Sequence, residues 1–137
     1  MEGLVIRPLE RSDEAALRVA LEDWELEPWF LFQDNFEDYL RFLSDQPIYY
    51  GFLGKDIVGR LVLRPPGDPT GDIGYIVLTQ YRRMGIGTVF LKKCHELLHR
   101  PLSLIVPVAN ERSWKLIEKE GGVLQSVSDG KRKYLYG

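Results

Sequence analysis

The chain has few of the residues that cross-link or anchor small proteins. Cys94 is the only cysteine among 137 residues, which excludes an internal disulfide framework and a cysteine-rich zinc site. No apolar run approaches the ~18 residues that a membrane span needs, and the first residues lack the charged and apolar regions of a signal peptide. We therefore expect a cytoplasmic location and no membrane partner.

A strong positive charge is also missing. The net charge is −2, whereas a nucleic-acid-binding protein is normally basic overall, so we expect no nucleic-acid partner. The hydrophobic fraction of 45% is typical of a globular protein, and the length suits one domain over residues 1–137 with a single core.

The charges that are present are unevenly distributed along the chain. Residues 10–45 carry 11 acidic and 3 basic side chains, a net of −8, and residues 46–137 carry 8 acidic and 14 basic side chains, a net of +6. This distribution fits an anionic ligand on one side and a cationic partner on the other. Two unrelated solvated surfaces would give the same pattern, and the sequence leaves both interpretations open.

Periodicity and turn residues predict an α/β (α+β) fold with the element order β-α-α-β-β-β-α-β-α-β-β. The second helix is expected after a cap at Asp34 or Asn35. Strand 102–108 follows a helix that itself follows strand 73–78, so we expect a right-handed crossover and parallel pairing of these two strands. The predicted strands are 4–9, 48–53, 57–63, 73–78, 102–108, 123–127 and 132–136.

The most informative stretch is residues 71–98, which is predicted to form a buried strand, a glycine-rich turn and an amphipathic helix. Gly85 and Gly87 allow a positive φ and a close approach of a ligand to the backbone. The unpaired N–H groups at the start of the helix, together with Arg82 and Arg83, suit a pyrophosphate. An ordinary strand–helix turn remains the alternative.

Two other phosphate-binding motifs do not fit this turn. A dinucleotide-binding Gly-x-Gly-x-x-Gly motif would need glycine at position 90, which is Phe90. The Gly-Lys-Ser/Thr sequence of a P-loop is absent from the chain.

The spacing Arg82-x-x-Gly85-x-Gly87 and the element order over residues 3–136 resemble the GNAT superfamily of N-acetyltransferases. The resemblance implies a mixed, mostly antiparallel sheet in which two central parallel strands splay apart, with the pantetheine arm between them. It also implies an acyltransferase that uses acetyl-CoA as co-substrate and needs no metal. The acetyl group would pass to a primary amine by direct attack in a ternary complex.

The resemblance also implies which residues bind coenzyme A. The main chain of Ile76, Val77 and Leu78 would pair with the pantetheine and stabilise the oxyanion, and Asn110 and Ser113 would contact the pantetheine. A plain helix N-cap at Asn110 and a packing role for Ser113 remain open. In many members proline stands where this chain has Thr79. The residues expected at the pyrophosphate are Arg82, Arg83, Met84, Gly85, Ile86, Gly87 and Thr88.

The catalytic groups are less clear, because the tyrosine that commonly protonates the thiolate is replaced by Ile117. Tyr134 or Tyr136 would reach the sulfur instead, or water would protonate it and both tyrosines are core or edge residues. Asp72 is a candidate base or a turn residue, and Glu25 and Glu27 are further candidates. The expected acceptor-binding residues are Trp24, Glu25, Trp29, Phe30 and Tyr75. A hydrophobic flap with solvated charges is the alternative for the segment from Trp24 to Phe30. Aromatic faces and carboxylates suit a cationic amine, either a small molecule or a peptide.

Two alternative functions follow from the same residues. The replacement at Ile117 also fits an acyl-CoA-binding domain that does not catalyse. His95-Glu96-Leu97-Leu98-His99 matches the His-Glu-x-x-His pattern of zinc proteases. The apolar stripe of this helix places both histidines on its solvent side, so we expect surface histidines and no metal. The oligomeric state, monomer or homodimer, is left open.

Overall fold

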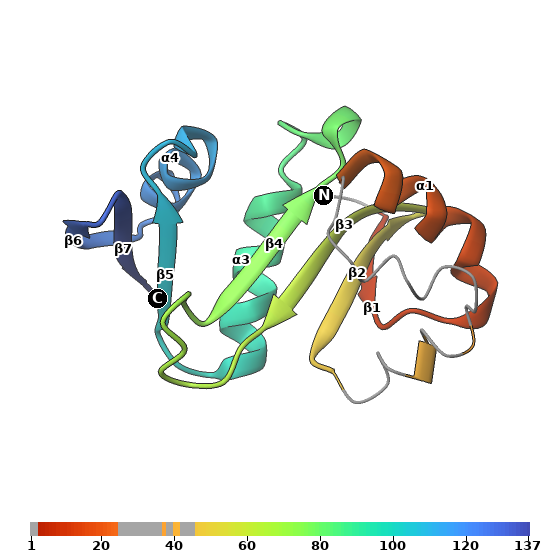
Figure 1. Cartoon of the computed structure of the whole chain (residues 1–137), viewed down its shortest axis with the longest axis horizontal. Helices are drawn as coiled ribbons and strands as arrows, with labels where there is room; N and C mark the ends of the chain where they lie inside the picture. Colours follow the sequence, from red (N-terminus) through yellow and green to blue (C-terminus); the bar gives the residue numbers. More distant parts are fainter. Residues whose placement is uncertain (1–2, 25–36, 38–39, 42–45) are drawn as a thin grey trace. The chain divides into compact units, whose positions relative to one another are not determined.

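The strands of the computed structural model form two sheets, one with the order β1-β2-β3-β4 and the other with the order β5-β7-β6 (Figure 1). The structure describes residues 3–24, 37, 40–41 and 46–137. The chain divides into two compact units, Met1–Val62 with Tyr75–Ile86, and Leu63–Gly74 with Gly87–Gly137. Each unit is compact by itself, and one domain over residues 1–137 stays a prediction.

The first unit is built on antiparallel strands that follow one another in the chain. β1 pairs with β2 from Leu4–Leu53 to Arg7–Tyr50, and β2 pairs with β3. Gly54 has φ +62° in the tight turn of the β2–β3 hairpin, where a side chain would be strained. The elements are β1 (Leu4–Arg7), η1 (Arg11–Asp13), α1 (Glu14–Trp24), β2 (Ile48–Leu53), β3 (Asp56–Leu63), β4 (Ile73–Val77) and η3 (Thr79–Tyr81).

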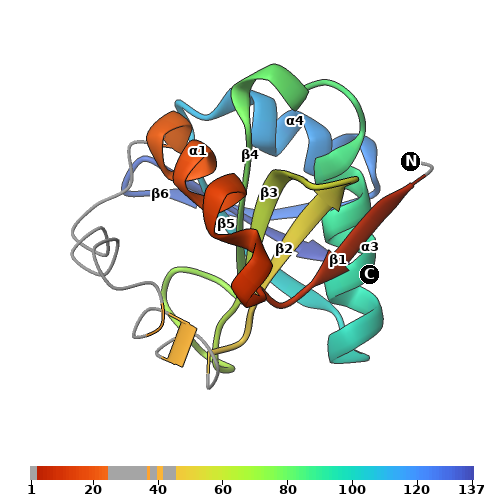
Figure 2. The ribbon, with the colours of Figure 1, turned by 90° about the vertical axis from the view of Figure 1, so that its right-hand side faces the viewer.

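The core of the first unit lies between α1 and the sheet. Leu17, Ala20 and Leu21 follow the three- and four-residue spacing that places side chains on one helix face, and all three are buried. This apolar face packs on buried side chains of β2 and β3 and on the residue after β4, and Figure 2 shows α1 beside these strands. The residues of this cluster outside α1 are Tyr50, Phe52, Ile57 and Leu78.

The second unit combines two helices with the three-stranded sheet. β7 is the central strand, and it pairs antiparallel with β5 and with β6. Asp129 and Gly130 both have a positive φ, as the two-residue turn of a β-hairpin requires. The elements are α3 (Ile86–Leu98), β5 (Leu102–Pro107), α4 (Glu111–Lys119), β6 (Val123–Ser128) and β7 (Lys131–Tyr136).

One face of β5 and the end of α4 define the core of the second unit. Burial alternates along β5, as expected for a strand with one covered face. α4 ends in a Schellman motif, in which Gly121 N–H donates to Glu118 O and Gly122 N–H donates to Ile117 O at 2.8 Å. The fully buried side chains of this unit include Phe90, Leu91, Cys94, Leu102, Ile117 and Tyr134.

Most predicted elements are found within one or two residues of their predicted bounds, and the mixed, mostly antiparallel architecture is confirmed. The second predicted helix, after Asp34 or Asn35, lies almost wholly outside the described residues. Among the helices that the structure describes, none has the length and apolar composition of a membrane span.

The predicted parallel ladder between strands 73–78 and 102–108 is wrong. β4 belongs to the first sheet, and β5 pairs with β7 in the second. A backbone hydrogen bond of 2.8 Å from Asp72 N–H to Ser103 O connects the chain before β4 to β5. The N–H of Ser103 donates to the side chain of Asp72. This N–H is therefore not free to bond to β4, as a parallel ladder between β4 and β5 would require. Separate sheets for β4 and β5 agree with the resemblance, which implies diverging strands.

Candidate functional site

The turn from Arg82 to Ile86 leaves η3 and enters α3 with an unusual backbone. Gly85 has φ +87°, and Arg83 also adopts the left-handed region with φ 68°. In the described part of the chain, and apart from Gly85 and its two chain neighbours, no heavy atom lies within 4 Å of the position that a Cβ on Gly85 would occupy. Both glycines allow a positive φ, but Gly87 is already helical, so only Gly85 adopts one. The turn therefore exposes bare backbone at its tip.

The N–H groups of this segment are available to a ligand. Among the described residues, no backbone carbonyl outside α3 accepts from the N–H groups of residues 83–88. The first four N–H groups of an α-helix also lack an intrahelical acceptor, which covers the start of α3 from Ile86. Consecutive unpaired N–H groups at the positive end of a helix dipole favour an anion.

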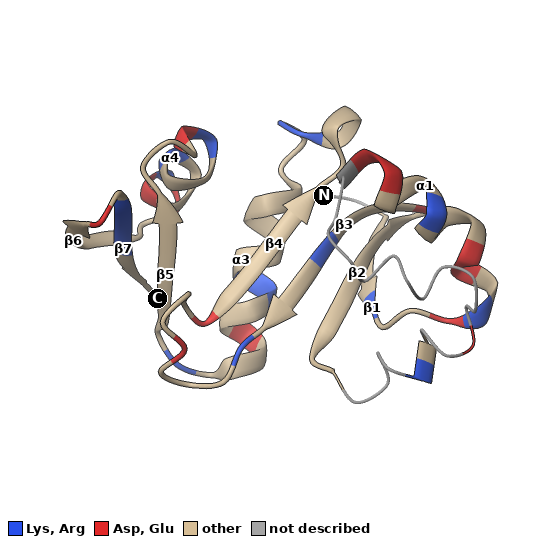
Figure 3. Cartoon of the chain, viewed as in Figure 1, with Lys and Arg blue, Asp and Glu red and all other residues tan. Residues whose placement is uncertain are grey.

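Side-chain charge reinforces this preference. Arg82 and Arg83 are exposed, and Lys and Arg colour the loop between β4 and α3 blue in Figure 3. The first turn of α3 contains no acidic residue that would repel an anion. Arg82 Nε donates to Val77 O at 3.4 Å, which leaves the two terminal nitrogens of this guanidinium for other partners.

Asp72, the predicted base candidate, is buried with a side-chain partner. Its Oδ2 atom accepts from Arg100 at 2.9 Å and from Ser103 N–H at 2.7 Å. Burial acts to raise the pKa of Asp72, but the bonds from Arg100 and Ser103 outweigh it, and the pKa lies below its usual range. A low pKa and occupied lone pairs favour a structural role. Arg100 was missed, because no local pattern marks a partner 28 residues away.

Tyr134, the predicted proton donor, is also fully buried and hydrogen-bonded. Its hydroxyl donates to Glu118 Oε2 at 2.6 Å and accepts from Arg132 at 3.1 Å. Burial, followed by the bond to Glu118, raises the pKa of Tyr134 above its ordinary value. The Arg132 guanidinium also lies 4.0 Å from the centre of the Trp114 ring. The cluster joins α4 to β7 and could not be predicted from local sequence patterns, because Glu118 and Tyr134 are 16 residues apart.

The start of α4 places the two residues expected at the pantetheine. Asn110 is the N-cap, and its side chain accepts from Ser113 N–H, so the capping interpretation is confirmed. Ser113 is partly buried in the first turn of α4. Ile117, where the family's tyrosine is expected, is 1% exposed.

The remaining site predictions fall on β4 and on the segment after α1. Tyr75, Ile76 and Val77 are partly buried, and Leu78 is buried, with its N–H donating to Val58 O. Trp24 is the last residue of α1, but its side chain is not described. Glu25, Glu27, Trp29 and Phe30 lie outside the described residues.

The His-Glu-x-x-His pattern does not form on one helix. α3 ends at Leu98, and His99 lies beyond it with φ 54°. The ring of His95 is partly buried and packs edge-on against Tyr136, with ring centres 5.9 Å apart. His99 is exposed as predicted, whereas His95 packs on a side chain. In the part of the chain that is described, no three His, Cys, Asp or Glu residues form a group able to hold a metal.

Comparisons with known proteins extend this description. The model of the acetyltransferase (GNAT) family matches residues 13–122. No curated protein sequence matches the chain significantly. A GNAT-family acetyltransferase from Streptococcus pneumoniae is 22% identical with a TM-score of 0.68, and the alignment covers 96% of each chain.

Two further solved structures have the same fold. The ribosomal-protein-S5-alanine acetyltransferase from Vibrio fischeri is 13% identical, with 99% of this chain and 92% of that chain covered and a TM-score of 0.75. A GNAT-family acetyltransferase from Bacillus anthracis is 16% identical, with 98% and 93% covered and a TM-score of 0.68. At these identities the structures show the fold alone. The match of the family model over most of the sequence shows that the chain belongs to the GNAT family of acetyltransferases.

Proposed function

We propose that this protein is an N-acetyltransferase that transfers the acetyl group of acetyl-CoA to a primary amine by direct attack in a ternary complex. Its family supports acetyl transfer; the amine acceptor and the direct mechanism are our proposal. The observation that carries it is the Arg82–Ile86 turn, with open space at Gly85 and unpaired N–H groups leading into α3. This geometry suits the pyrophosphate of coenzyme A.

Individual roles follow from the same geometry. The N–H groups of residues 83–88 bind the pyrophosphate, and Arg82 and Arg83 add charge. Asn110 and Ser113 are proposed to contact the pantetheine. Acetyl-CoA supplies the activated acetyl group as a thioester, so the protein has to hold the substrates, stabilise the oxyanion and move protons.

Val77 is the best candidate for the oxyanion donor among the three predicted residues. Leu78 N–H is occupied by Val58 O on β3 at 2.8 Å. N–H groups alternate in direction along a strand, so the N–H of Ile76 points to the same side as that of Leu78. The N–H of Val77 points away from β3, as does its carbonyl, which accepts from Arg82. We therefore assign the oxyanion contact to Val77 N–H.

The acceptor is proposed to be a cationic amine. The acidic residues at 10–45 favour such a substrate electrostatically. Trp24, Glu25, Glu27, Trp29, Phe30 and Tyr75 remain the proposed acceptor residues. We also propose a cytoplasmic protein that works as a monomer or a homodimer.

A second function, acyl-CoA binding without catalysis, is favoured by one observation. Ile117 is buried where the family's proton-donating tyrosine is expected, and the Tyr134 hydroxyl is bonded to Glu118 and Arg132. Proton transfer would then fall to water or to residues outside the described part.

Release of the CoA thiol from acetyl-CoA with a panel of acceptors separates these functions. The panel holds amino acids, polyamines, aminoglycosides and peptides with a free α-amine, each with an alcohol analogue as its matched control. We expect thiol release with at least one amine and none with its alcohol analogue. Acetyl-CoA binding without release on any acceptor would favour the second function, and the absence of binding would contradict both.

A further inference from the structure

Asp23, in the last turn of α1, contacts the residue with which η3 begins. Its Oδ2 atom accepts a hydrogen bond of 3.0 Å from Thr79 N–H and one of 3.3 Å from the Thr79 hydroxyl. The two residues are 56 positions apart in the sequence, and both belong to the first unit. The contact therefore connects α1 to the segment that leads into the Arg82–Ile86 turn.

The contact fills the place of a helix cap. The first N–H groups of a helical turn have no partner within it, and Leu78 at the N-cap position of η3 supplies no side-chain bond. Asp23 supplies that bond from another helix. Proline at position 79 has no N–H and would exclude the contact, so the departure at Thr79 is structurally meaningful.

Further hydrogen bonds connect residues 78 and 79 to the start of the turn. Thr79 O accepts from Arg82 N–H at 3.3 Å, and Leu78 O accepts from Tyr81 N–H at 2.9 Å. Leu78 itself is buried in the core that α1 covers. Residues 78 and 79 are thus fixed by the core on one side and by Asp23 on the other, immediately before the turn.

The charge of Asp23 opposes the binding of an anion nearby. A carboxylate that contacts Thr79, three residues before Arg82, repels a pyrophosphate bound at the turn, and removing only the charge should strengthen binding slightly. Removing the hydrogen-bond acceptor should loosen η3 and weaken binding. The two effects have opposite signs, so they can be measured separately.

We propose that Asp23 is a positioning residue for coenzyme A, which acts by holding Thr79 and thereby the N–H groups of the Arg82–Ile86 turn. This proposal rests on the proposed function of that turn. A backbone fixed before the ligand arrives binds more tightly, because less conformational freedom is lost on binding.

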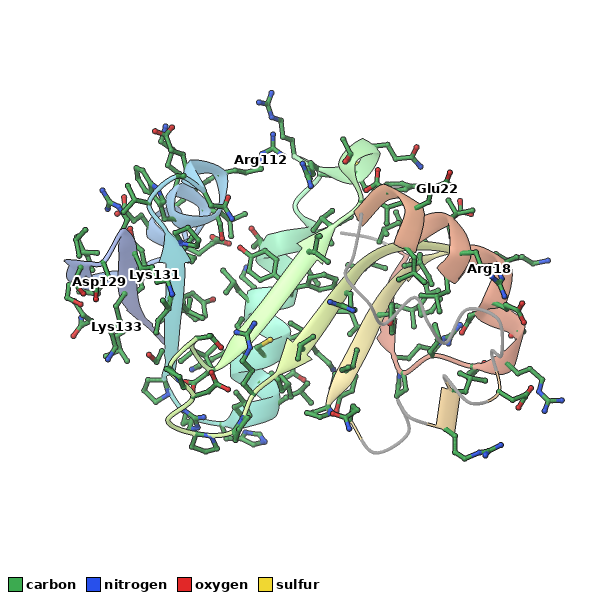
Figure 4. The ribbon with its side chains drawn as sticks, viewed as in Figure 1. Arg18, Glu22, Arg112, Asp129, Lys131 and Lys133 are labelled. Carbon is green, nitrogen blue, oxygen red and sulfur yellow. The ribbon has the colours of Figure 1, made fainter. Side chains whose placement is uncertain are left out.

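Titration calorimetry with CoA tests the proposal on Asp23→Ala, Asp23→Asn and Glu22→Ala. Glu22 is exposed in the same helical turn, so its variant removes a neighbouring charge as the matched control (Figure 4). We expect Asp23→Ala to weaken binding roughly tenfold, as for the loss of a charge-assisted hydrogen bond. Asp23→Asn keeps an acceptor oxygen and should stay within about twofold of the wild type. Equal affinities of Asp23→Ala and Glu22→Ala would overturn the proposal.

Amide hydrogen exchange provides a readout that needs no ligand. Exchange at Thr79 and Arg82 should accelerate in Asp23→Ala and remain unchanged in Glu22→Ala. Thr79→Val keeps the N–H bond and should exchange like the wild type. Unchanged exchange rates in Asp23→Ala would show that the contact does not hold Thr79 in place, and would overturn the proposal even if CoA binds. Failure of the wild type to bind CoA, with accelerated exchange in Asp23→Ala, would overturn the proposed function and leave the contact established.

Discussion

The carboxylate of Asp72 accepts a hydrogen bond of 2.7 Å from the backbone N–H of Ser103, and the backbone N–H of Asp72 donates to the carbonyl oxygen of Ser103 at 2.8 Å. Asp72 thus occupies both backbone groups of one residue on β5. Its own carbonyl accepts from Arg64 N–H at the end of β3. Asp72 is therefore hydrogen-bonded both to β5 and to the residue that follows β3.

Replacing Asp72 tests whether its role is structural. Asp72→Asn should lower the free energy of unfolding at neutral pH by about 2 kcal/mol, because the charged partner of Arg100 is lost. Asp129→Asn, in an exposed turn that tolerates asparagine, is the control. Chemical denaturation measures both. Native stability with a strongly reduced kcat would instead support Asp72 as the catalytic base.

The same pair predicts how stability depends on pH. The pKa of Asp72 in the folded protein lies below its unfolded value, so its contribution is present above the unfolded pKa and is lost as the pH falls through the folded pKa. The stability difference between the wild type and Asp72→Asn should be constant near neutral pH and shrink below about pH 4. A difference that persists at lower pH would contradict the assigned charge state.

Alanine substitutions at two glycines with a similar positive φ distinguish the cost of backbone strain from the cost of a steric clash. Gly71 and Gly67 have φ of +97° and +82°, but only Gly71 lies against β5, where a Cβ would stand 3.1 Å from Ile105 N and from Ser103 O. Each substitution by alanine should cost about 1 kcal/mol for the left-handed backbone. Gly71→Ala should cost more, because the backbone of β5 has to shift. Equal melting temperatures of the two variants would contradict this packing.

Tyr134→Phe tests the tyrosine proposed as proton donor. Removing the hydroxyl leaves Glu118 without its 2.6 Å bond, so we expect a loss of about 1 kcal/mol in stability. We expect kcat to stay within about twofold if the role is structural, as its burial favours. Tyr136→Phe tests the other candidate tyrosine in the same way, and the ring contact of Tyr136 with His95 does not depend on its hydroxyl. A fall in kcat of about a hundredfold with native stability would support the catalytic assignment.

Cys94 should not interfere with an assay that measures free thiol. Burial raises the pKa of Cys94 to about 12, and its side chain is fully buried. The reactive thiolate is therefore almost absent at neutral pH. A disulfide reagent should detect no thiol in the native protein and one per chain after denaturation. Rapid native labelling would contradict the buried position.

The sequence predicts those features whose cause is local. Strand and helix positions, the hairpin at Gly54, the cap at Asn110 and the glycine turn at Gly85 follow from periodicity and backbone preference. The match of the family model agrees with the resemblance that this turn suggested.

The partners of charged side chains could not be predicted in the same way. Asp72 was a candidate base because it stands at the start of a predicted strand. Its partner Arg100 could not be recognised from the sequence, because Arg100 follows only after the intervening helix α3. Asp23 and Thr79 meet for the same reason, because folding brings α1 to the end of β4. The parallel pairing failed because Asp72 takes both backbone groups of Ser103, which a ladder along this edge of β5 would need.

Binding of CoA to Gly85 variants tests the central claim most directly. Gly85→Asp and Gly85→Asn have nearly equal size and tolerate a positive φ similarly, so they differ mainly in charge at the tip of the turn. By calorimetry, we expect Gly85→Asn to weaken CoA binding and Gly85→Asp, like the larger Gly85→Glu, to abolish it. Wild-type affinity in Gly85→Asp would contradict a pyrophosphate at this turn.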